Sequence, residues 1–363
     1  MKKIAIIISC SLTILSCSDR ANNARKRLDI SELENTSDSI TYFLDSTFAI
    51  IKRHGLYKDK LDWENIHDTY YKPNVKKDSL EAIFSVFSEI FNTMEDKHSM
   101  MWHGKILYSA TIDFNDTLPE AKETLREAYK TGEAVLMAKR IEDYGYIRIP
   151  YLRSSDDFEE EVAKSQEIQD MICDIYSDDI KGWILDLRLN GGGDMFPMIS
   201  GIQQFLGEGT FASVLEQHKT TDWYIKDGGV YYDKDRAAEL KNYCLPKNLI
   251  NAKVAVLTSQ FTASSGEITG LAFKGRPNTI FIGERSKGLM TANEVYSLPF
   301  GEGIEPLGII LTLSIGYEQD RNNNQMSFLR PDIYLFEDDN FHELEKDKKV
   351  IEAIKWFKSD EKI

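Results

Sequence analysis

The sequence contains few cysteines and few histidines. Only 4 cysteines and 6 histidines occur among 363 residues. So few cysteines exclude a disulfide-rich scaffold, and no Cys/His spacing is typical of a metal site, so we expect neither a metal nor another cofactor. Cys10 and Cys17 lie near the N-terminus. Cys173 and Cys244 remain for one disulfide, although the apolar neighbours of Cys173 favour a plain core cysteine.

Long apolar runs are missing beyond the N-terminus. Residues 1–16 carry two lysines directly after Met1, and the apolar run at 4–15 is shorter than the ~20 residues of a permanent membrane span. This pattern is typical of a signal peptide. The segment ends in Ile-Leu-Ser-Cys, which resembles the bacterial lipobox and implies lipidation of Cys17. The alternative is an ordinary cleaved signal with an incidental cysteine. We expect an extracytoplasmic globule held to the membrane only by this lipid, with a linker at 17–27.

Positive charge is in deficit. There are 44 Lys and Arg against 59 Asp and Glu, which gives a formal net charge of −15, and removal of Lys2 and Lys3 with the signal would leave −17. This charge argues against nucleic acid or an anionic membrane surface as the main partner. It is compatible with cationic peptides as substrates.

Apolar residues recur at helix spacing near the N-terminus, and residues 28–103 are predicted to form a helical bundle. Two stripes carry this prediction, and we interpret their aromatic members as core rather than ligand-binding side chains. The first contains Ile40, Phe43, Leu44, Phe48 and Ile51, and the second contains Leu80, Ile83, Phe84, Phe87, Phe91 and Met94.

A glycine-rich turn follows a predicted buried strand in residues 182–194, whose sequence is GWILDLRLNGGGD. A helix is predicted to follow at 196–205. Three consecutive glycines let a backbone approach another group closely and expose its N–H groups. The spacing fits neither the dinucleotide-binding nor the P-loop pattern. Asp186 and Arg188 are interpreted as a structural pair that supports the strand.

A second informative stretch places a serine where a strand gives way to a helix. The apolar run 254–257 predicts a buried strand, residues 264–274 a helix, and 279–282 a second strand. Ser264 would then lie at the helix N-terminus, beside free N–H groups and the positive end of the dipole. Two interpretations fit: a capping box with Glu267, or a nucleophile whose attack generates a stabilised oxyanion.

The two stretches together resemble a known family. TASSGE, a strand ending in Gly-Glu, and the turn Asp-x-Arg-x-Asn-x-Gly-Gly resemble serine peptidases of the C-terminal processing and tricorn type. TASSGEIT followed by TANE is most similar to the nisin-resistance branch. The resemblance covers roughly residues 95–332. It implies an α/β fold with a crotonase/ClpP-like peptidase core.

The resemblance also implies roles for individual residues. Ser264, which follows Thr-Ala, would be the nucleophile. Asp-x-His-Ser after the N-terminal bundle resembles the segment that carries the catalytic histidine, so His98 would be the general base. The N–H of Gly192 or its neighbour Gly193, together with that of Ser265, would form the oxyanion hole.

The sequence leaves alternatives for the general base and for the residue that orients it. The lysine that some family members use would fall at Leu289, and Lys287 lies two positions away, so we expect histidine activation. Glu267, one turn along the helix from the serine, is our candidate for orienting His98. Glu318 is a second candidate, and either glutamate would be structural otherwise.

The resemblance also bears on domain organisation. Residues 104–143 are about half the length of a PDZ domain, so we expect no PDZ domain there. A small cap would fit this segment. The peptidase core would span 144–363 with a hairpin insertion at 210–245.

We therefore expect an extracytoplasmic, lipid-anchored serine endopeptidase that cleaves extended or C-terminal peptide segments through a Ser-His pair. The alternative is a catalytically inactive protein of the same fold that binds a peptide or an apolar ligand. An extracytoplasmic esterase would share the nucleophile but would not require an extended peptide groove.

Overall fold

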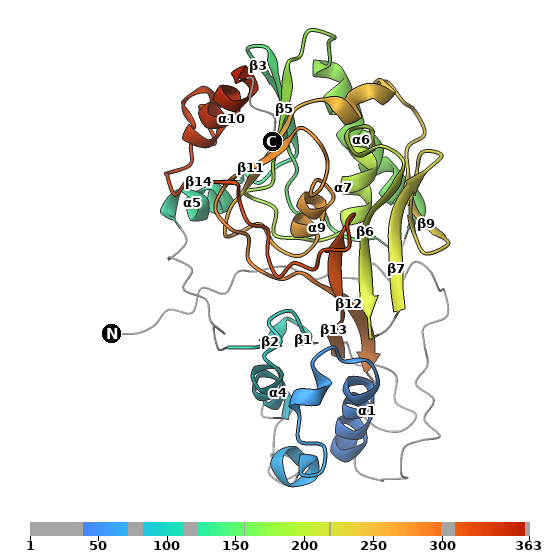
Figure 1. Cartoon of the computed structure of the whole chain (residues 1–363). Coiled ribbons are helices and arrows are strands. Elements are labelled where there is room, and N and C mark those ends of the chain that lie inside the picture. Colours follow the sequence, from blue (N-terminus) through green and yellow to red (C-terminus); the bar gives the residue numbers. More distant parts are fainter. Residues whose placement is uncertain are drawn as a thin grey trace.

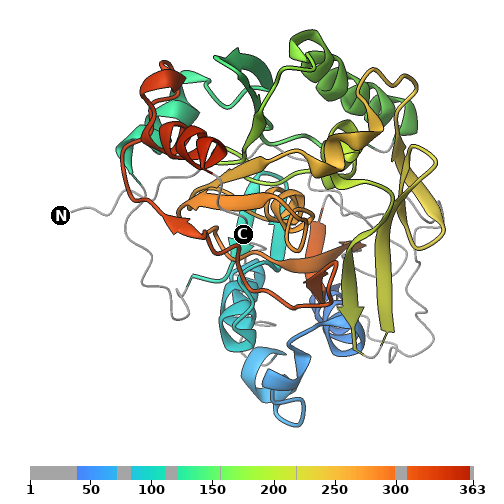
Figure 2. The ribbon, with the colours of Figure 1, turned by 45° about the horizontal axis from the view of Figure 1, so that its top comes forward.

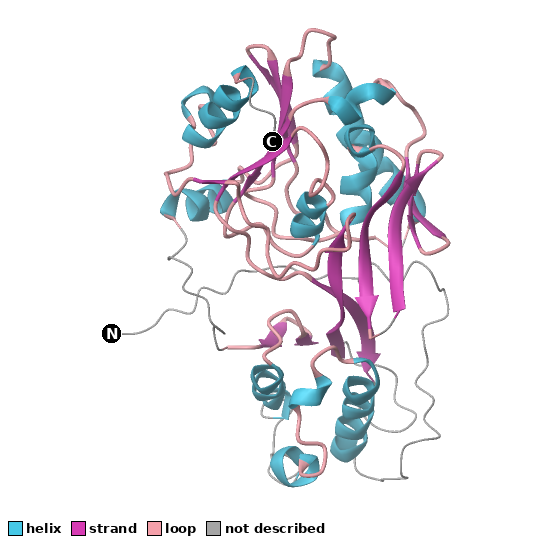
Figure 3. Ribbon diagram, in the orientation of Figure 1, coloured by secondary structure: helices cyan, strands magenta, loops and turns pink. Residues whose placement is uncertain are grey.

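The computed structural model describes a mixed α/β chain built on two β-sheets (Figure 1; Figure 3). The described residues are 39–71, 83–111, 122–155, 157–217, 219–298 and 309–359. The predicted signal peptide, Cys17 and the linker lie outside these residues. Within the described part, no helix combines the length and the apolar character needed to cross a membrane.

The six-stranded sheet holds the strands predicted from continuous apolar runs. Its order is β14-β11-β10-β5-β4-β3, parallel throughout except for the antiparallel β3–β4 pair. Trp183 and Leu185 face a core shared with α6, α7 and α9, whereas Ile184 faces α10. Burial on both faces explains why these strands lack a polar alternation. Its strands are β3 (Met137–Ile141), β4 (Tyr144–Arg148), β5 (Gly182–Asp186), β10 (Val254–Thr258), β11 (Thr279–Gly283) and β14 (Ile333–Tyr334).

The eight-stranded sheet is antiparallel and joins distant parts of the chain. Its order is β2-β1-β13-β6-β7-β8-β9, with β12 also paired to β13. The predicted hairpin insertion at 210–245 contributes four strands, β6 to β9, to this sheet. The strands are β1 (Met100–His103), β2 (Ile106–Ser109), β6 (Gly209–Glu216), β7 (Lys219–Lys226), β8 (Gly229–Tyr232), β9 (Asp235–Glu239), β12 (Thr291–Leu298) and β13 (Ile309–Asp320).

Helices cover both sheets, as the turned view also shows (Figure 2). The sequence predicts a closing helix over residues 340–357, but the helix begins only at Lys348, because the Asp347 side chain accepts the N–H groups of Lys349 and Val350 and caps it there. The helices are α1 (Ser39–His54), α4 (Val86–Met94), α5 (Glu123–Thr131), α6 (Phe158–Ile175), α7 (Met195–Gly201), α8 (Gln203–Leu206), α9 (Ser265–Leu271) and α10 (Lys348–Lys358). Shorter helical turns are η2 (Lys58–Lys60), η3 (His67–Tyr71), η4 (Lys247–Asn251) and η5 (Leu344–Lys346).

The N-terminal helices do not form a core of their own. The apolar faces of α1 and α4 pack with Met101 of β1 and with apolar residues of β12 and β13, at the bottom of Figure 1. The expected boundary at residue 103 therefore cuts through a shared core. The physical reason is that a two-helix face needs an apolar partner, and the end of the antiparallel sheet supplies it.

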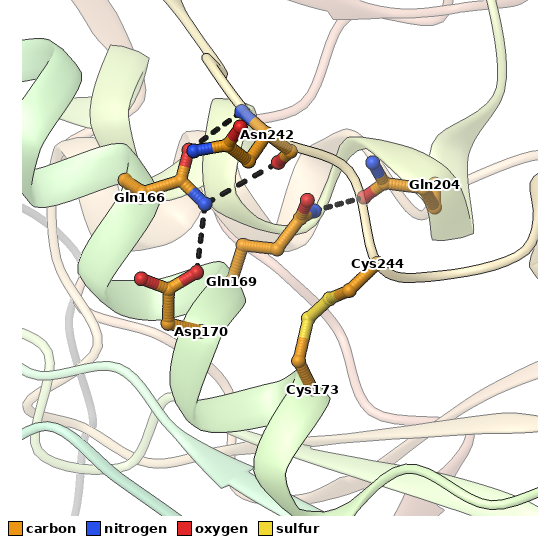
Figure 4. Close-up of a disulfide and its surroundings, with 7 residues drawn as sticks. All are labelled: Gln166, Gln169, Asp170, Cys173, Gln204, Asn242 and Cys244. Carbon is orange, nitrogen blue, oxygen red and sulfur yellow. Dashed lines mark hydrogen bonds between the residues drawn. A yellow bond between two sulfur atoms is a disulfide. The ribbon is translucent and has the colours of Figure 1, made fainter.

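Cys173 and Cys244 form a disulfide, contrary to the expectation that Cys173 is a plain core cysteine (Figure 4). Cys173 lies on α6 and Cys244 follows β9, and their Cα atoms are 6.0 Å apart, within the range of disulfides. The bond fastens the end of the β6–β9 region to the helix.

Candidate active site

His98 is held in the turn between α4 and β1. The helix ends as Glu95 adopts φ 53°, and the chain then reverses around the buried carboxylate of Asp96. One oxygen of that carboxylate accepts the backbone N–H groups of His98 and Ser99, each at 3.0 Å. These bonds hold the backbone of the turn, and His98 is only 6% exposed.

Ser264 lies at the N-terminus of α9 on a strained backbone. Its φ of 50° and ψ of −123° fall in a region that residues other than glycine seldom adopt. Two contacts hold the turn in place: Glu267 Oε2 accepts the Ser264 N–H at 2.9 Å, and the N–H of Ala263 bonds the carbonyl of Asn190 at 3.0 Å. This conformation presents the hydroxyl at the mouth of the helix.

The two side chains meet although 166 residues separate them. The distance from His98 Nε2 to Ser264 Oγ is 3.1 Å, which is hydrogen-bond length. The predicted capping box between Ser264 and Glu267 is present, and the serine hydroxyl also contacts the imidazole. A hydroxyl bonded to a neutral imidazole is the arrangement that activates a serine.

The other nitrogen of the ring contacts a hydroxyl. His98 Nδ1 lies 2.9 Å from Thr291 Oγ1, at the start of β12. This contact corrects the expectation that Glu267 orients the ring. The Glu267 carboxylate instead accepts hydrogen bonds from three backbone N–H groups and one hydroxyl. The donors are the N–H groups of Ser264, Gly288 and Leu289 and the hydroxyl of Ser286.

Glu318 is not a hydrogen-bond partner of the ring either, since the two ring nitrogens contact Thr291 and Ser264. It is buried on β13, and its Oε2 has no hydrogen-bond partner among the described residues. Burial, and secondarily the nearby Glu267, holds the pKa of Glu318 well above its ordinary value. Burial raises the pKa of Glu267 to about 7 against the opposing effect of its hydrogen-bond donors.

The glycine turn approaches Ser264 closely. A Cβ on Gly192 would lie 3.1 Å from the Ser264 Cβ, and Gly192 has φ 114°. The Gly192 N–H already bonds Asn190 Oδ1 at 2.9 Å. For Gly193 and Ser265, no acceptor for the N–H occurs in the described part of the chain. Of the two glycines considered, Gly193 is therefore the one whose N–H is available beside Ser265.

Three comparisons with known proteins show the family and the fold of the chain. Residues 143–335, more than half of the chain, match Peptidase family S41. The chain belongs to peptidase family S41. It is also 29% identical over 150 residues to the nisin-resistance protein of Lactococcus lactis subsp. lactis, a match that spans 41% of this chain and 44% of that relative.

Solved structures show the same fold as this S41 peptidase. A lipoprotein from Streptococcus agalactiae has a TM-score of 0.64 at 22% identity, covering 90% of this chain and 98% of that one. The photosystem II D1 C-terminal processing protease has a TM-score of 0.50 at 13% identity, covering 83% and 94%. Family membership and fold support a serine peptidase activity in general.

The electrostatics of the site suit a base. Burial lowers the pKa of His98 to about 4, so the ring is neutral and able to accept a proton at pH 7. Lys287, which lies two positions from where the family's lysine base would fall, has an exposed side chain. No group of three or more metal-ligating side chains occurs within the described ranges.

Several residues of the S41 site had no predicted role. Thr291 and Asn293 lie in the TANE stretch, which contributed to the family resemblance without a function being assigned. Asp96 and Ser99 flank His98 in the motif that located the histidine. Their roles depend on contacts with Ser314 of β13, more than 200 residues away, so the local sequence carried no usable signal.

Proposed function

We propose that this chain is an extracytoplasmic serine endopeptidase in which Ser264 is the nucleophile and His98 the general base. The 3.1 Å contact between the two side chains at the mouth of α9 carries the proposal. The strained serine backbone and the neutral imidazole support it further.

The proposed reaction proceeds in two halves. Ser264 Oγ attacks the peptide carbonyl carbon as His98 Nε2 takes its proton, which gives a tetrahedral intermediate. The N–H groups of Gly193 and Ser265 stabilise its oxyanion. The C–N bond breaks, and the imidazolium protonates the leaving amine. A water molecule then attacks the acyl-enzyme, again with His98 as base, which releases the carboxylic acid and restores the serine.

The substrate class follows from the family and from charge. S41 membership implies a peptide or protein substrate, and the net charge of −15 favours a cationic one. The D1 processing protease is named for acting at a C-terminus, and we propose cleavage of extended or C-terminal segments here. The name of the nisin-resistance protein makes nisin one peptide to test, although the match covers less than half of that relative.

Active-site labelling tests the enzyme against the inactive binder. A fluorophosphonate should label the wild type and should not label Ser264→Ala. Ser297→Ala, which changes an exposed serine on β12, is the matched control and should be labelled normally. A wild-type protein that is folded yet unlabelled would favour the binding protein.

Digestion then separates a peptidase from an esterase. Wild-type protein should cleave a peptide library, with products identified by mass spectrometry, and Ser264→Ala should not. Hydrolysis of an activated ester with no peptide cleaved would contradict the proposal.

The proposed anchor rests on Cys17, which lies outside the described residues. Cells producing the full-length chain should incorporate labelled fatty acid into the wild type and not into Cys17→Ser. The variant should leave the membrane fraction. Equal incorporation in both proteins would exclude this lipidation site.

A further inference from the structure

A chain of hydroxyl groups runs from His98 to a buried carboxylate. The ring Nδ1 contacts Thr291 Oγ1 at 2.9 Å, and that oxygen lies 3.0 Å from Ser314 Oγ. Ser314 Oγ in turn lies 2.8 Å from Asp96 Oδ1. The four residues come from the α4–β1 turn, β12 and β13. Each link has hydrogen-bond length.

The Asp96 carboxylate determines which group donates and which accepts in every hydrogen bond of this series. An ionised carboxylate only accepts hydrogen bonds, so the single hydroxyl hydrogen of Ser314 points to Asp96. Ser314 Oγ must then accept from Thr291, whose own hydrogen is thereby used. Thr291 Oγ1 can therefore only accept from the ring, which places the hydrogen of His98 on Nδ1.

A competing acceptor leads to the same result. Thr291 Oγ1 also lies 3.3 Å from Asn293 Oδ1, a longer and therefore weaker contact. If the Thr291 hydrogen points there, the threonine oxygen still has only lone pairs to offer the ring. In both arrangements His98 Nε2 is left bare and faces the Ser264 hydroxyl at 3.1 Å.

The Asp96 carboxylate, at the end of this series of hydrogen bonds, is held by several donors. Asp96 is 1% exposed, and its two oxygens accept four hydrogen bonds. The donors are the N–H groups of His98 and Ser99 and the hydroxyls of Ser99 and Ser314. Burial raises the pKa of Asp96 against the opposing effect of these hydrogen-bond donors. Oδ1 already accepts two backbone N–H groups, so the hydrogen of a protonated carboxyl group would lie on Oδ2, and Oδ1 accepts from Ser314 in either protonation state.

We propose that Thr291 is the positioning residue that sets the tautomer of His98, and that Ser314 and Asp96 fix the direction of its hydroxyl. This inference rests on the proposed function, because a bare Nε2 matters only if His98 deprotonates Ser264. It differs from a triad in which an acid touches the imidazole directly, since two neutral hydroxyls separate the charge from the ring.

The two hydroxyls that lie between the Asp96 charge and the His98 ring affect the pKa of the imidazole. An acid in contact with the ring would raise the pKa of the imidazole, whereas a threonine hydroxyl supplies an acceptor without a full charge. The low pKa of His98, which burial causes, is consistent with a neutral partner. The ring is thus held in the correct tautomer and remains a base far below neutral pH.

The principal test replaces Thr291 by valine, which keeps the shape and removes the hydroxyl. We expect kcat to fall about 10³-fold, less than the ~10⁴-fold loss seen when a directly bonded acid no longer sets the tautomer. KM should change little, because the threonine touches the histidine rather than the substrate. Thr291→Ser retains the hydroxyl and should restore most of kcat.

Thr312→Val is the matched control. Thr312 is a buried threonine on β13, two residues from Ser314, and its hydroxyl has no hydrogen-bond partner among the residues described. The same substitution there should leave kcat at the wild-type value. Equal losses of kcat in Thr312→Val and Thr291→Val would show a general effect of removing buried hydroxyls and would overturn the proposal.

Two further variants test the distal links. Ser314→Ala should lower kcat only about tenfold, because Thr291 can still donate to Asn293. Asp96→Asn keeps an oxygen acceptor for Ser314 but removes the charge, so the tautomer should persist while kcat falls. Wild-type kcat in both variants would exclude Ser314 and Asp96 from the arrangement.

A spectroscopic measurement tests the tautomer without relying on activity. Two-bond ¹H–¹⁵N correlation spectra of the full chain distinguish a protonated from a bare ring nitrogen, and the His98 signals are those lost in His98→Gln. We expect Nδ1–H in the wild type and its loss in Thr291→Val. A wild-type Nε2–H tautomer would overturn the proposal. If the chain cleaves no peptide, the proposed function fails, and the spectra still decide this inference.

Discussion

The low pKa of His98 predicts how activity depends on pH. The imidazole acts as a base only when neutral, and burial lowers its pKa to about 4. As pH falls, kcat/KM should therefore hold until about pH 5 and then decline with a midpoint near 4, because kcat/KM reports the free enzyme. The measurement is a pH profile of peptide cleavage with stability checked at each pH.

Glu267 offers a competing explanation for any pH dependence, since its pKa is raised to about 7. Glu267→Gln removes that titration and should leave the acidic midpoint near 4. A wild-type midpoint near 7 that disappears in Glu267→Gln would instead assign the pH dependence to the glutamate.

Glu267 is predicted to stabilise the serine turn rather than to orient the histidine. Its carboxylate accepts N–H groups from Ser264, Gly288 and Leu289, and Glu267→Ala would leave these donors without their acceptor. Each buried unsatisfied donor costs about 1–3 kcal/mol, so the free energy of unfolding should fall by roughly 3 kcal/mol or more in urea denaturation. Glu345→Ala, at an exposed surface pair, is the control and should change it by less than about 1 kcal/mol. Equal stability of the two variants would argue against this role.

The disulfide between α6 and the segment after β9 predicts a redox-dependent stability. It closes a sequence separation of 71 residues, for which chain entropy suggests a stabilisation of about 4 kcal/mol. Cys244→Ser should lower the free energy of unfolding by this order, measured in denaturant without reductant. Adding reductant should destabilise the wild type similarly and leave the variant unchanged. Two free thiols at these positions in the oxidised protein would refute the pairing.

The individual strands and helices were largely predictable from the sequence. β10, α9 and β11 form the predicted strand–helix–strand unit, because a parallel strand buried on both faces needs a continuous apolar run and a helix end needs a cap. The predicted Asp186–Arg188 pair is also present. Where the observed pattern differed, as at the start of α10, a single capping side chain decided the boundary.

The shared core between the N-terminal helices and the antiparallel sheet predicts that packing there affects the active site. Phe87 of α4 is fully buried, in edge contact with Phe43. Phe87→Ala should cost about 3–5 kcal/mol of stability. It should also lower kcat at temperatures where the protein stays folded, because this core carries the turn that holds His98.

Phe357→Ala is the comparison variant. Phe357 lies in the separate core between α10 and the parallel sheet, stacked on Tyr144. It should lose stability without losing kcat. If both variants retain kcat when folded, the N-terminal core does not position the histidine.

The sequence by itself determined the local features: the order of strands and helices, the serine at a helix mouth, the glycine turn, and the family to which these motifs belong. These follow from periodicity, caps and backbone freedom, which act over a few residues. Only the tertiary structure decided which residue faces His98 and that the two cysteines pair. It also decided that, among the described residues, the N–H of Gly193 has no acceptor whereas that of Gly192 has one. Each of these depends on contacts between segments that are distant in the chain, and such contacts exist only after the two sheets have assembled.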